Sequence, residues 1–275
     1  MLLALDAGNS NIVMALFDTA GATPHEPVAD WRITTNKQQT ADEYGILLRE
    51  LFAMRQIPMD VVDAIIVSSV VPPIDSALRQ VCERQFKVKP LFVEPGVKTG
   101  LPVLVDSPAE VGADRIVNCV AAFEKYGGPC IVVDLGTATT FDVISARGEF
   151  IGGAIAPGLE ISADALFEHA AKLPRVDVKR PAKIIGTSTT DNIQIGLFYG
   201  YIGMVDGILE RMIAELGPQT KLVATGGLAR LLAGGSKYVS EVDPMLTMTG
   251  LRIVYERNAE RGRRRPVAAN AAAHS

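Results

Sequence analysis

The sequence contains one short pattern twice, and this duplication limits the folds available to the chain. An apolar run, Leu2 to Leu5, ends at Asp6-Ala7-Gly8-Asn9-Ser10, after which Ile12 to Phe17 is again apolar. The pattern returns about half a chain later, where 131–133 leads into Asp134-Leu135-Gly136-Thr137 and a further apolar run. Each copy is typical of a strand, a turn and a second strand. We therefore predict a duplicated domain with a polar turn in each half.

The segments that follow the first copy indicate alternating strands and helices. Trp31 to Thr34 is a predicted strand, and the capping box Thr40-Ala-Asp-Glu43 opens a predicted helix that ends near Arg55. The pattern then predicts a buried strand over 63–69 and a helix over 74–86. This order favours a layered α/β fold.

The duplication also suggests a division of the chain. We expect an N-terminal lobe at 1–118 that carries the first turn and a C-terminal lobe at 119–255 that carries the later ones. The remaining residues, 256–275, are rich in Arg and Ala and lack large apolar side chains after Val267. We therefore expect these residues to form a disordered tail.

Composition argues against several classes of partner. The net charge is -4 and the pI is about 5.5, which offers no broad cationic surface for nucleic acid. No run of eighteen apolar residues is present, so we expect no membrane span. The cysteines, Cys82, Cys119 and Cys130, form no CxxC pair and lie in apolar segments. Buried, reduced thiols of this kind are typical of the cytoplasm, where we expect the protein to reside.

The first polar turn has the residues of a phosphate-binding site. Gly8 lets a ligand approach the backbone, and successive N–H groups in such a turn can bind an anion. Asp6 would repel phosphates unless it held Mg²⁺, which is commonly shared between carboxylates and substrate phosphates. Taken alone, this turn is also compatible with an ordinary hairpin. Its repetition at Asp134 favours the phosphate site.

Two further turns extend this interpretation. Asp134-x-Gly136-Thr137 supplies a second carboxylate and a hydroxyl, and Thr225-Gly226-Gly227 joins a strand to an apolar helix. The paired glycines would allow a flat adenine to approach, although plain α/β architecture also produces such a turn. The chain thus has two phosphate turns followed by the turn at Thr225-Gly226-Gly227, which we call the nucleoside turn. This order resembles the one found in the superfamily of sugar kinases, heat-shock chaperones and actin. No GxxxxGK[ST] loop is present.

A further acidic motif could supply the base of a kinase reaction. In Gly112-Ala113-Asp114-Arg115, the carboxylate of Asp114 can accept the proton of an alcohol. Arg115 can pair with an anionic substrate. Taken without further motifs, an Asp-Arg pair at the start of a helix is more often a cap with a surface ion pair.

Six motifs in order give a more specific resemblance. The sequence from about 1 to 255 resembles type III pantothenate kinases, through Asp6-x-Gly8-Asn9-Ser10, Thr99-Gly100-Leu101-Pro102, Gly112-Ala113-Asp114-Arg115, Asp134-x-Gly136-Thr137-Ala138-Thr139-Thr140, Gly152-Gly153-x-Ile155-x-Pro157-Gly158 and Thr225-Gly226-Gly227. The resemblance implies two actin-like (ribonuclease H-like) domains, each a mixed sheet flanked by helices, with a nucleotide cleft between them. It also implies transfer of phosphate from ATP to pantothenate, the first step of coenzyme A biosynthesis.

The resemblance assigns roles to individual residues. It implies that ATP is bound by Asp6, Ala7, Gly8, Asn9, Ser10, Asn11, Ile12, Val13 and Thr137, with Mg²⁺ held by Asp6 through the phosphates. It implies that pantothenate is bound by Gly112, Ala113, Asp114, Arg115 and Thr189, with Asp114 as the proton acceptor. His169 contacts the substrate in some members, although a surface histidine is an equal alternative. Asp134 is implied to bind a monovalent cation, K⁺ or NH₄⁺. Val105 departs from the pattern, because some members have a tyrosine there.

A glycine stripe suggests a subunit contact. Gly196, Gly200, Gly203 and Gly207 fall on one face of a predicted helix over 192–216. Each costs roughly 1 kcal/mol against alanine inside a helix, so close helix packing is expected to compensate. The stripe packs either within the monomer or across the interface of a homodimer, and the resemblance favours the homodimer.

Two rival functions remain open on the sequence. One is an enzyme of the same superfamily that acts on another small alcohol or carboxylate. The other is a nucleotide-responsive regulator that has lost turnover, against which the presence of Asp114 and its flanking residues argues.

Overall fold

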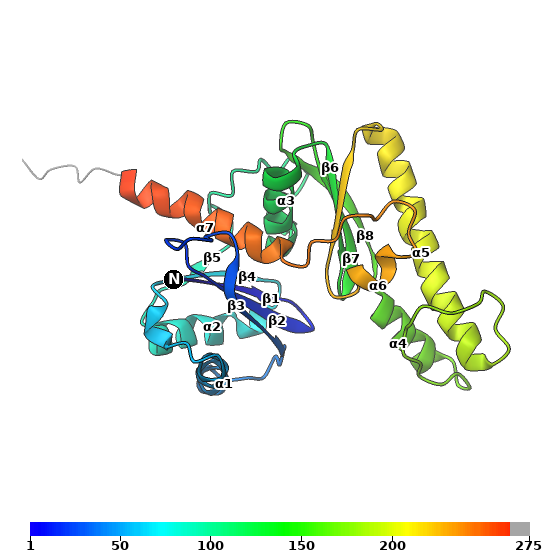
Figure 1. The fold of residues 1–275 in the computed structure, drawn as a ribbon, viewed down its shortest axis with the longest axis horizontal. Helices are drawn as coiled ribbons and strands as arrows, with labels where there is room; N and C mark the ends of the chain where they lie inside the picture. The colour runs from blue at the N-terminus through cyan, green and yellow to red at the C-terminus, as the bar shows by residue number, and fades with distance from the viewer. Residues whose placement is uncertain (265–275) are drawn as a thin grey trace, which may run out of the picture.

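Two β-sheets form the framework of the protein (Figure 1). The computed structural model describes the backbone of residues 1–264 and the side chains of residues 1–259. The first sheet has the order β3-β2-β1-β4-β5 and contains β1 (Leu2–Ala7), β2 (Asn11–Phe17), β3 (Pro27–Thr34), β4 (Ala64–Ser69) and β5 (Leu91–Phe92). The second has the order β8-β7-β6-β9 and contains β6 (Cys130–Leu135), β7 (Ala138–Ile144), β8 (Phe150–Pro157) and β9 (Lys221–Thr225).

The two sheets repeat the same pairing around their central strands. In the first sheet Asp6 lies opposite Val13 on antiparallel β2 and opposite Ser68 on parallel β4. In the second, Asp134 lies opposite Thr140 on antiparallel β7 and opposite Thr225 on parallel β9. The duplication predicted from the sequence is therefore confirmed down to the register of the strands.

Helices cover the outer face of each sheet. On the first sheet these are α1 (Ala41–Met54) and α2 (Pro72–Val81), and on the second α4 (Leu159–His169), α5 (Thr189–Leu216) and α6 (Ala229–Ala233). Shorter helical turns occupy Met59–Val61, Cys82–Phe86 and Pro108–Glu110. Alternate residues of β3 face α1, so Trp31 is buried and stacks on Phe52 with ring centroids 4.8 Å apart.

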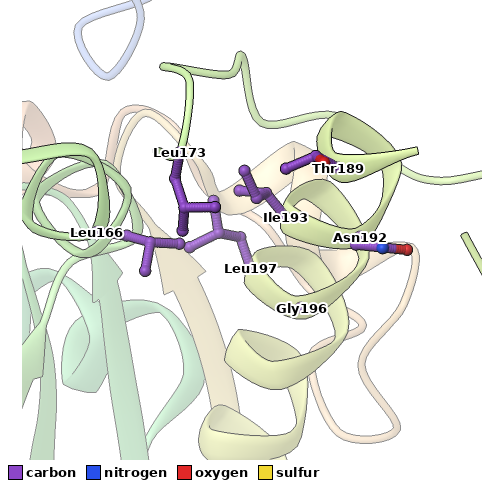
Figure 2. Close-up of a pocket in the computed structure, with 7 residues that line it drawn as sticks. All are labelled: Leu166, Leu173, Thr189, Asn192, Ile193, Gly196 and Leu197. Carbon is purple, nitrogen blue, oxygen red and sulfur yellow. The ribbon is translucent and has the colours of Figure 1, made fainter. Parts of the chain in front are cut away.

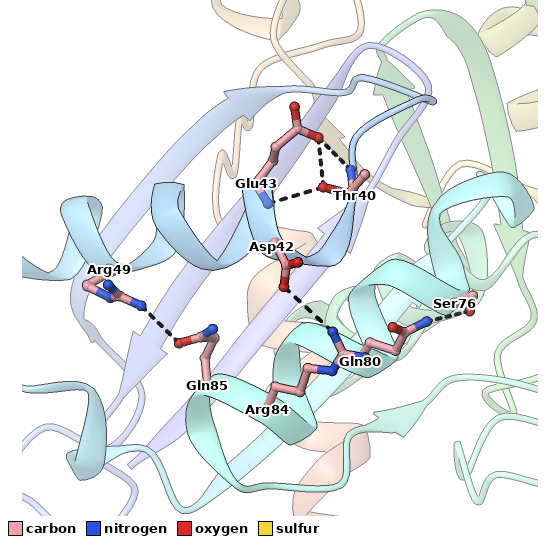
Figure 3. A network of polar contacts seen from close by, with 8 residues as sticks. All are labelled: Thr40, Asp42, Glu43, Arg49, Ser76, Gln80, Arg84 and Gln85. Atoms are coloured by element: carbon pink, nitrogen blue, oxygen red, sulfur yellow. Dashed lines mark hydrogen bonds and ion pairs between the residues drawn. The ribbon is translucent and has the colours of Figure 1, made fainter.

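The start of α1 follows the sequence prediction. Thr40 Oγ1 accepts the N–H of Glu43 at 3.3 Å, and Glu43 Oε2 accepts the N–H of Thr40 at 2.8 Å, which completes the capping box (Figure 3). Exposed contacts such as Arg84 with Asp42, at 3.6 Å, join α1 to the segment after α2. Ion pairs this exposed contribute little to stability.

Two helices pack against each other between the sheets. Of these, α3 (Ala113–Tyr126) contacts β4 of the first sheet and β6 and β7 of the second, whereas α7 (Leu246–Arg264) contacts β1, β2 and β4. The crossing is close, because a Cβ on Gly250 would overlap the carbonyl of Val117. The chain thus returns to the first sheet after completing the second (Figure 1).

This arrangement bears on the expected ends of the lobes. The boundary at 118 falls inside α3, which touches both sheets, and the division into 1–118 and 119–255 stays a prediction. The expected tail from 256 is corrected in part, since α7 continues to Arg264, and residues 265–275 lie outside the described residues. Within residues 1–264, every helix is too short or too polar to traverse a lipid bilayer.

Candidate active site

A cleft of about 580 Å³ lies where the turns of the two sheets meet. The first phosphate turn, the second phosphate turn, the Thr225-Gly226-Gly227 turn and Asp114 all line it. Of the residues predicted to bind ATP, those that line the cleft are Asp6, Gly8, Asn9, Ser10, Asn11, Val13 and Thr137. The side chains of Ala7 and Ile12 are buried in the core, so these two residues could contact ATP only through their backbone atoms. The structure therefore gathers motifs that are up to 220 residues apart in the sequence.

The first phosphate turn is held by a hydrogen bond within the turn and by one from Thr35, the residue after β3. The Gly8 N–H donates to the Asn11 carbonyl at 3.0 Å, and Thr35 Oγ1 donates to the Gly8 carbonyl at 2.6 Å. Ser10 Oγ lies 2.8 Å from Thr137 Oγ1, so the hydroxyls of the two phosphate turns touch across the cleft. Both hydroxyls are exposed and available to a ligand.

The third turn requires its glycine. Gly226 has φ of +93°, in the left-handed region that disfavours other residues. A Cβ there would lie 2.6 Å from both Asp134 Oδ1 and the Leu135 carbonyl. The turn therefore packs directly against the second phosphate turn, and no larger residue fits between them.

Within residues 1–259, three of the four carboxylic acids that line the cleft, Asp6, Asp114 and Asp134, have a raised pKa. Burial is the main cause that raises the pKa of Asp6 to about 8, and the negative charge of Asp114 is the second. The contact with Ser68 opposes the shift. Burial, again followed by Asp114, raises the pKa of Asp134 to about 7. Burial also raises the pKa of Asp114, against the N–H that Arg115 donates to its Oδ1 at 2.8 Å.

These carboxylates fit a cation that is shared with a ligand. Asp6 Oδ1 is buried and has no hydrogen-bond partner among the described residues, and a buried unpaired acceptor is costly. No three His, Cys, Asp or Glu side chains in the described part of the chain gather closely enough to hold an ion by themselves. The residues present therefore suit Mg²⁺ that completes its shell with phosphate oxygens and water.

Asp114 and Arg115 separate at the start of α3. The N-cap of α3 is Gly112, and no side chain caps the helix. The alternative in which Asp114 is only a helix cap is therefore wrong. Arg115 turns away to β7, where Nε donates to Asp142 Oδ1 at 2.7 Å and Nη2 lies 2.5 Å from the same oxygen. Asp142 is fully buried. Asp114 lines the cleft, whereas Gly112, Ala113 and Arg115 do not.

Thr189 and His169 lie elsewhere in this chain. Thr189 borders a second pocket, of about 410 Å³, between α4 and α5, and Figure 2 shows the aliphatic side chains that point into it. Its lining is Leu166, Leu173, Thr189, Asn192, Ile193, Gly196 and Leu197. His169 is exposed at the end of α4, and Val105 packs against the core between the sheets. The structure does not bring these three residues to the cleft of the same chain.

Several residues that approach the site were missed by the sequence analysis. Asn118 Nδ2 donates to Asp134 Oδ2 at 3.1 Å, and Thr247 Oγ1 donates to Asn118 Oδ1 at 2.7 Å. Asn118 lies four residues after Asp114, so helical spacing was a signal that could have placed both on one face. Arg32 and Arg230 also line the cleft.

Comparison with known proteins decides the family. The family model described as type III pantothenate kinase matches residues 2–211. A type III pantothenate kinase of Koribacter versatilis is 59% identical over 273 residues, with 96% of this chain and 98% of the relative covered. One from Acidobacterium capsulatum is 61% identical over 257 residues, covering 93% and 94%.

The chain belongs to the type III pantothenate kinase family. Among solved structures, the activator of 2-hydroxyisocaproyl-CoA dehydratase from Clostridium difficile, with bound ADPNP, superposes with a TM-score of 0.55. It is 11% identical and the match covers 98% of this chain and 99% of that one. At this identity the likeness shows the fold alone, and it confirms the actin-like architecture expected for a type III pantothenate kinase.

Proposed function

We propose that this enzyme transfers the γ-phosphoryl group of ATP to the primary hydroxyl of pantothenate and forms 4′-phosphopantothenate, the first step of coenzyme A biosynthesis. The observation that carries the proposal is one cleft in which Asp114 faces both phosphate turns. Membership of the family supplies the substrate. The buried cysteines, which form no disulfide among the described residues, support a cytoplasmic location.

Each group in the cleft has a task in this reaction. Asp114 aligns the hydroxyl and accepts its proton, and its raised pKa favours proton acceptance near neutral pH. Ser10, Thr137 and the N–H groups of the two turns hold the phosphates. Asp6 would hold Mg²⁺, which would neutralise part of the charge on the phosphates. Most of the rate enhancement then comes from positioning and electrostatics.

A substrate panel separates this proposal from a related kinase that acts on another alcohol. We expect purified enzyme with Mg-ATP to release ADP when pantothenate is added and to do so far less with other small alcohols or hydroxy acids at equal concentration. In competition, pantothenate should suppress turnover of any alternative acceptor. An acceptor with a higher kcat/KM than pantothenate would replace pantothenate as the substrate.

Asp134 is proposed to bind a monovalent cation. Its Oδ2 accepts a hydrogen bond from Asn118 at 3.1 Å, and burial, followed by the negative charge of Asp114, raises its pKa to about 7, so a bound cation would favour its ionised form. We expect ADP formation to require K⁺ or NH₄⁺ and to fall by at least about tenfold in Na⁺ alone, since a site for a larger ion holds a smaller one poorly. Initial rates at matched ionic strength measure this. Equal rates in K⁺ and Na⁺ would remove the cation role from Asp134.

The glycine stripe of α5 is proposed as the interface of a homodimer. Gly196, Gly200 and Gly203 are exposed, and no atom of the chain lies within 4 Å of the position of a Cβ on any of them. The monomer therefore does not compensate for the helix propensity that these glycines lose. Thr189 begins the same helix outside its own cleft, so its predicted contact with pantothenate requires a second copy of the chain.

This open face makes the dimer prediction sharper. We expect Gly200→Leu or Gly203→Leu to leave the monomer folded, because both positions are exposed and an added Cβ has no atom of the chain within 4 Å, but to split the dimer by overpacking its interface. Light scattering with a thermal melt measures both effects. Glu210→Ala, on an exposed position of α5, is the matched control and should remain dimeric. A wild-type monomer at micromolar concentration would refute the interface.

A further inference from the structure

The positive charge in the cleft comes from two arginines that no motif includes. Among the described residues that line the cleft, Arg32 and Arg230 are the only cationic side chains. They face four carboxylic acids, those of Asp6, Asp114, Asp134 and Glu160. A triphosphate that enters this cleft therefore meets a surplus of acidic groups, and the chain has no lysine of the P-loop kind to offset it.

Strand alternation directs Arg32 into the cleft. Trp31 points to the core and donates Nε1–H to the Leu51 carbonyl at 3.1 Å, so the next residue of β3 faces the opposite side of the sheet. There Arg32 lies opposite Val13, which lies opposite Asp6. The three form one row across β3, β2 and β1, and all three line the cleft. Arg32 thus flanks the proposed magnesium carboxylate two strands away, at about 10 Å between backbones.

The side chain of Arg32 spans the cleft. Its Nη1 lies 3.6 Å from the position of a Cβ on Gly227, in the nucleoside turn that follows the second sheet. Arg230 stands on that opposite side, in α6, three residues after Gly227. The two arginine side chains therefore line the cleft from opposite lobes, and that of Arg32 reaches across to the nucleoside turn.

Neither guanidinium has a partner within the described protein. Most arginines of residues 1–259 form a hydrogen bond or an ion pair through the side chain. Those that form neither are Arg32, Arg55, Arg180 and Arg230. Arg32 and Arg230 are exposed to solvent and free to bind an anion. Arg55 is equally exposed but caps the end of α1, outside the cleft, and so provides a matched control.

We propose that Arg32 and Arg230 bind the phosphate groups of the nucleoside triphosphate, one from each side of the cleft. The proposal rests on the proposed function, in that ATP occupies this cleft. A guanidinium offers a planar fork of N–H donors that matches two phosphate oxygens, and it stays protonated at any working pH. The two arginines thereby take the place of the absent lysine and offset the charge that the carboxylates leave uncompensated.

Methionine substitutions test the proposal because they remove the guanidinium group and keep an unbranched apolar stem. We expect Arg32→Met and Arg230→Met to raise the KM for ATP by about tenfold each, the usual cost of a charged hydrogen bond, and to change the KM for pantothenate by less than about twofold. Arg55→Met should leave both constants unchanged. Arg32→Lys should recover part of the loss because it restores the charge without the fork.

Two measurements separate phosphate binding from other roles. Inorganic triphosphate carries no base, so its inhibition constant should rise in Arg32→Met and Arg230→Met as the KM for ATP does. An unchanged inhibition constant in both variants would overturn the assignment to the phosphates. The rise in melting temperature on adding Mg-ATP needs no turnover, and it should shrink in both variants while their ligand-free melting temperatures match that of Arg55→Met.

The outcomes also distinguish this proposal from the proposed function. Wild-type enzyme that shows a Mg-ATP shift but makes no ADP with pantothenate would contradict the proposed function and leave the arginine assignment standing. Active wild-type enzyme with both methionine variants indistinguishable from Arg55→Met would overturn the arginine assignment alone.

Discussion

Asp114→Asn is expected to fold, to bind Mg-ATP and to lose turnover by about 10²- to 10⁴-fold, the range for removal of a positioned acid or base. The amide keeps the size of the side chain but cannot accept the proton of the pantothenate hydroxyl. It also removes one charge from a group of three carboxylates, so the fold should not weaken. Steady-state kinetics and the melting temperature measure the two effects.

The control for this variant is another aspartate of the same region. Asp106→Asn changes an exposed carboxylate in the loop before α3 and should leave kcat within about twofold of wild type, as most surface substitutions do. Retention of more than half the activity in Asp114→Asn would remove Asp114 from the role of base.

Asp6→Asn is expected to lose turnover by a similar factor and yet to stabilise the metal-free protein. The raised pKa of Asp6, about 8, means that the folded state resists ionisation of this carboxyl more than the unfolded state does. Ionisation therefore costs stability progressively as pH rises from about 4 to 8, and the cost is fully present above the folded pKa. We expect Asp6→Asn to raise the free energy of unfolding by about 1–3 kcal/mol at pH 8, and by less at pH 5.

Denaturant unfolding in EDTA at the two pH values checks this trade between stability and activity. Asp60→Asn, at an exposed position in a short helical turn, is the control and should shift neither stability nor kcat. Mg-ATP should stabilise the wild type more than Asp6→Asn, because binding to the folded state alone adds to its stability. A variant that is less stable than wild type at pH 8 would contradict the assigned cause of the pKa shift.

Local patterns predicted the parts of the fold that local chemistry determines. The turns at Asp6 and Asp134, the strands on either side of them and the capping box of α1 follow from apolar periodicity and from turn and cap residues. The repeat predicted two equivalent turns, and the family resemblance implied a nucleotide cleft between the two domains. Their shared register could not be read from either copy alone, since it depends on strand pairing across the sheet.

Local sequence patterns could not predict the features that depend on tertiary packing. From the sequence we predict no helix over 246–264 and expect a tail from 256, whereas α7 occupies this segment and returns to the first sheet. The pairing of Arg115 with Asp142 joins a helix to a strand that the sequence separates by 27 residues, so it gave no local signal. The orientation of Arg32 could have been predicted from the sequence, because it follows the apolar Trp31 on a strand and successive side chains of a strand point to opposite faces.

The central claim is that the cleft between the two sheets catalyses phosphorylation of pantothenate, and analysis of the products tests it most directly. Purified enzyme is incubated with Mg-ATP, K⁺ and pantothenate, and ADP and phosphorylated pantothenate are quantified together by chromatography and mass spectrometry. The account predicts that both products form in equal amounts, that neither forms without pantothenate, and that both nearly vanish in Asp114→Asn. ADP that forms at the same rate with and without pantothenate, or pantothenate that remains unmodified while ATP is consumed, would contradict it.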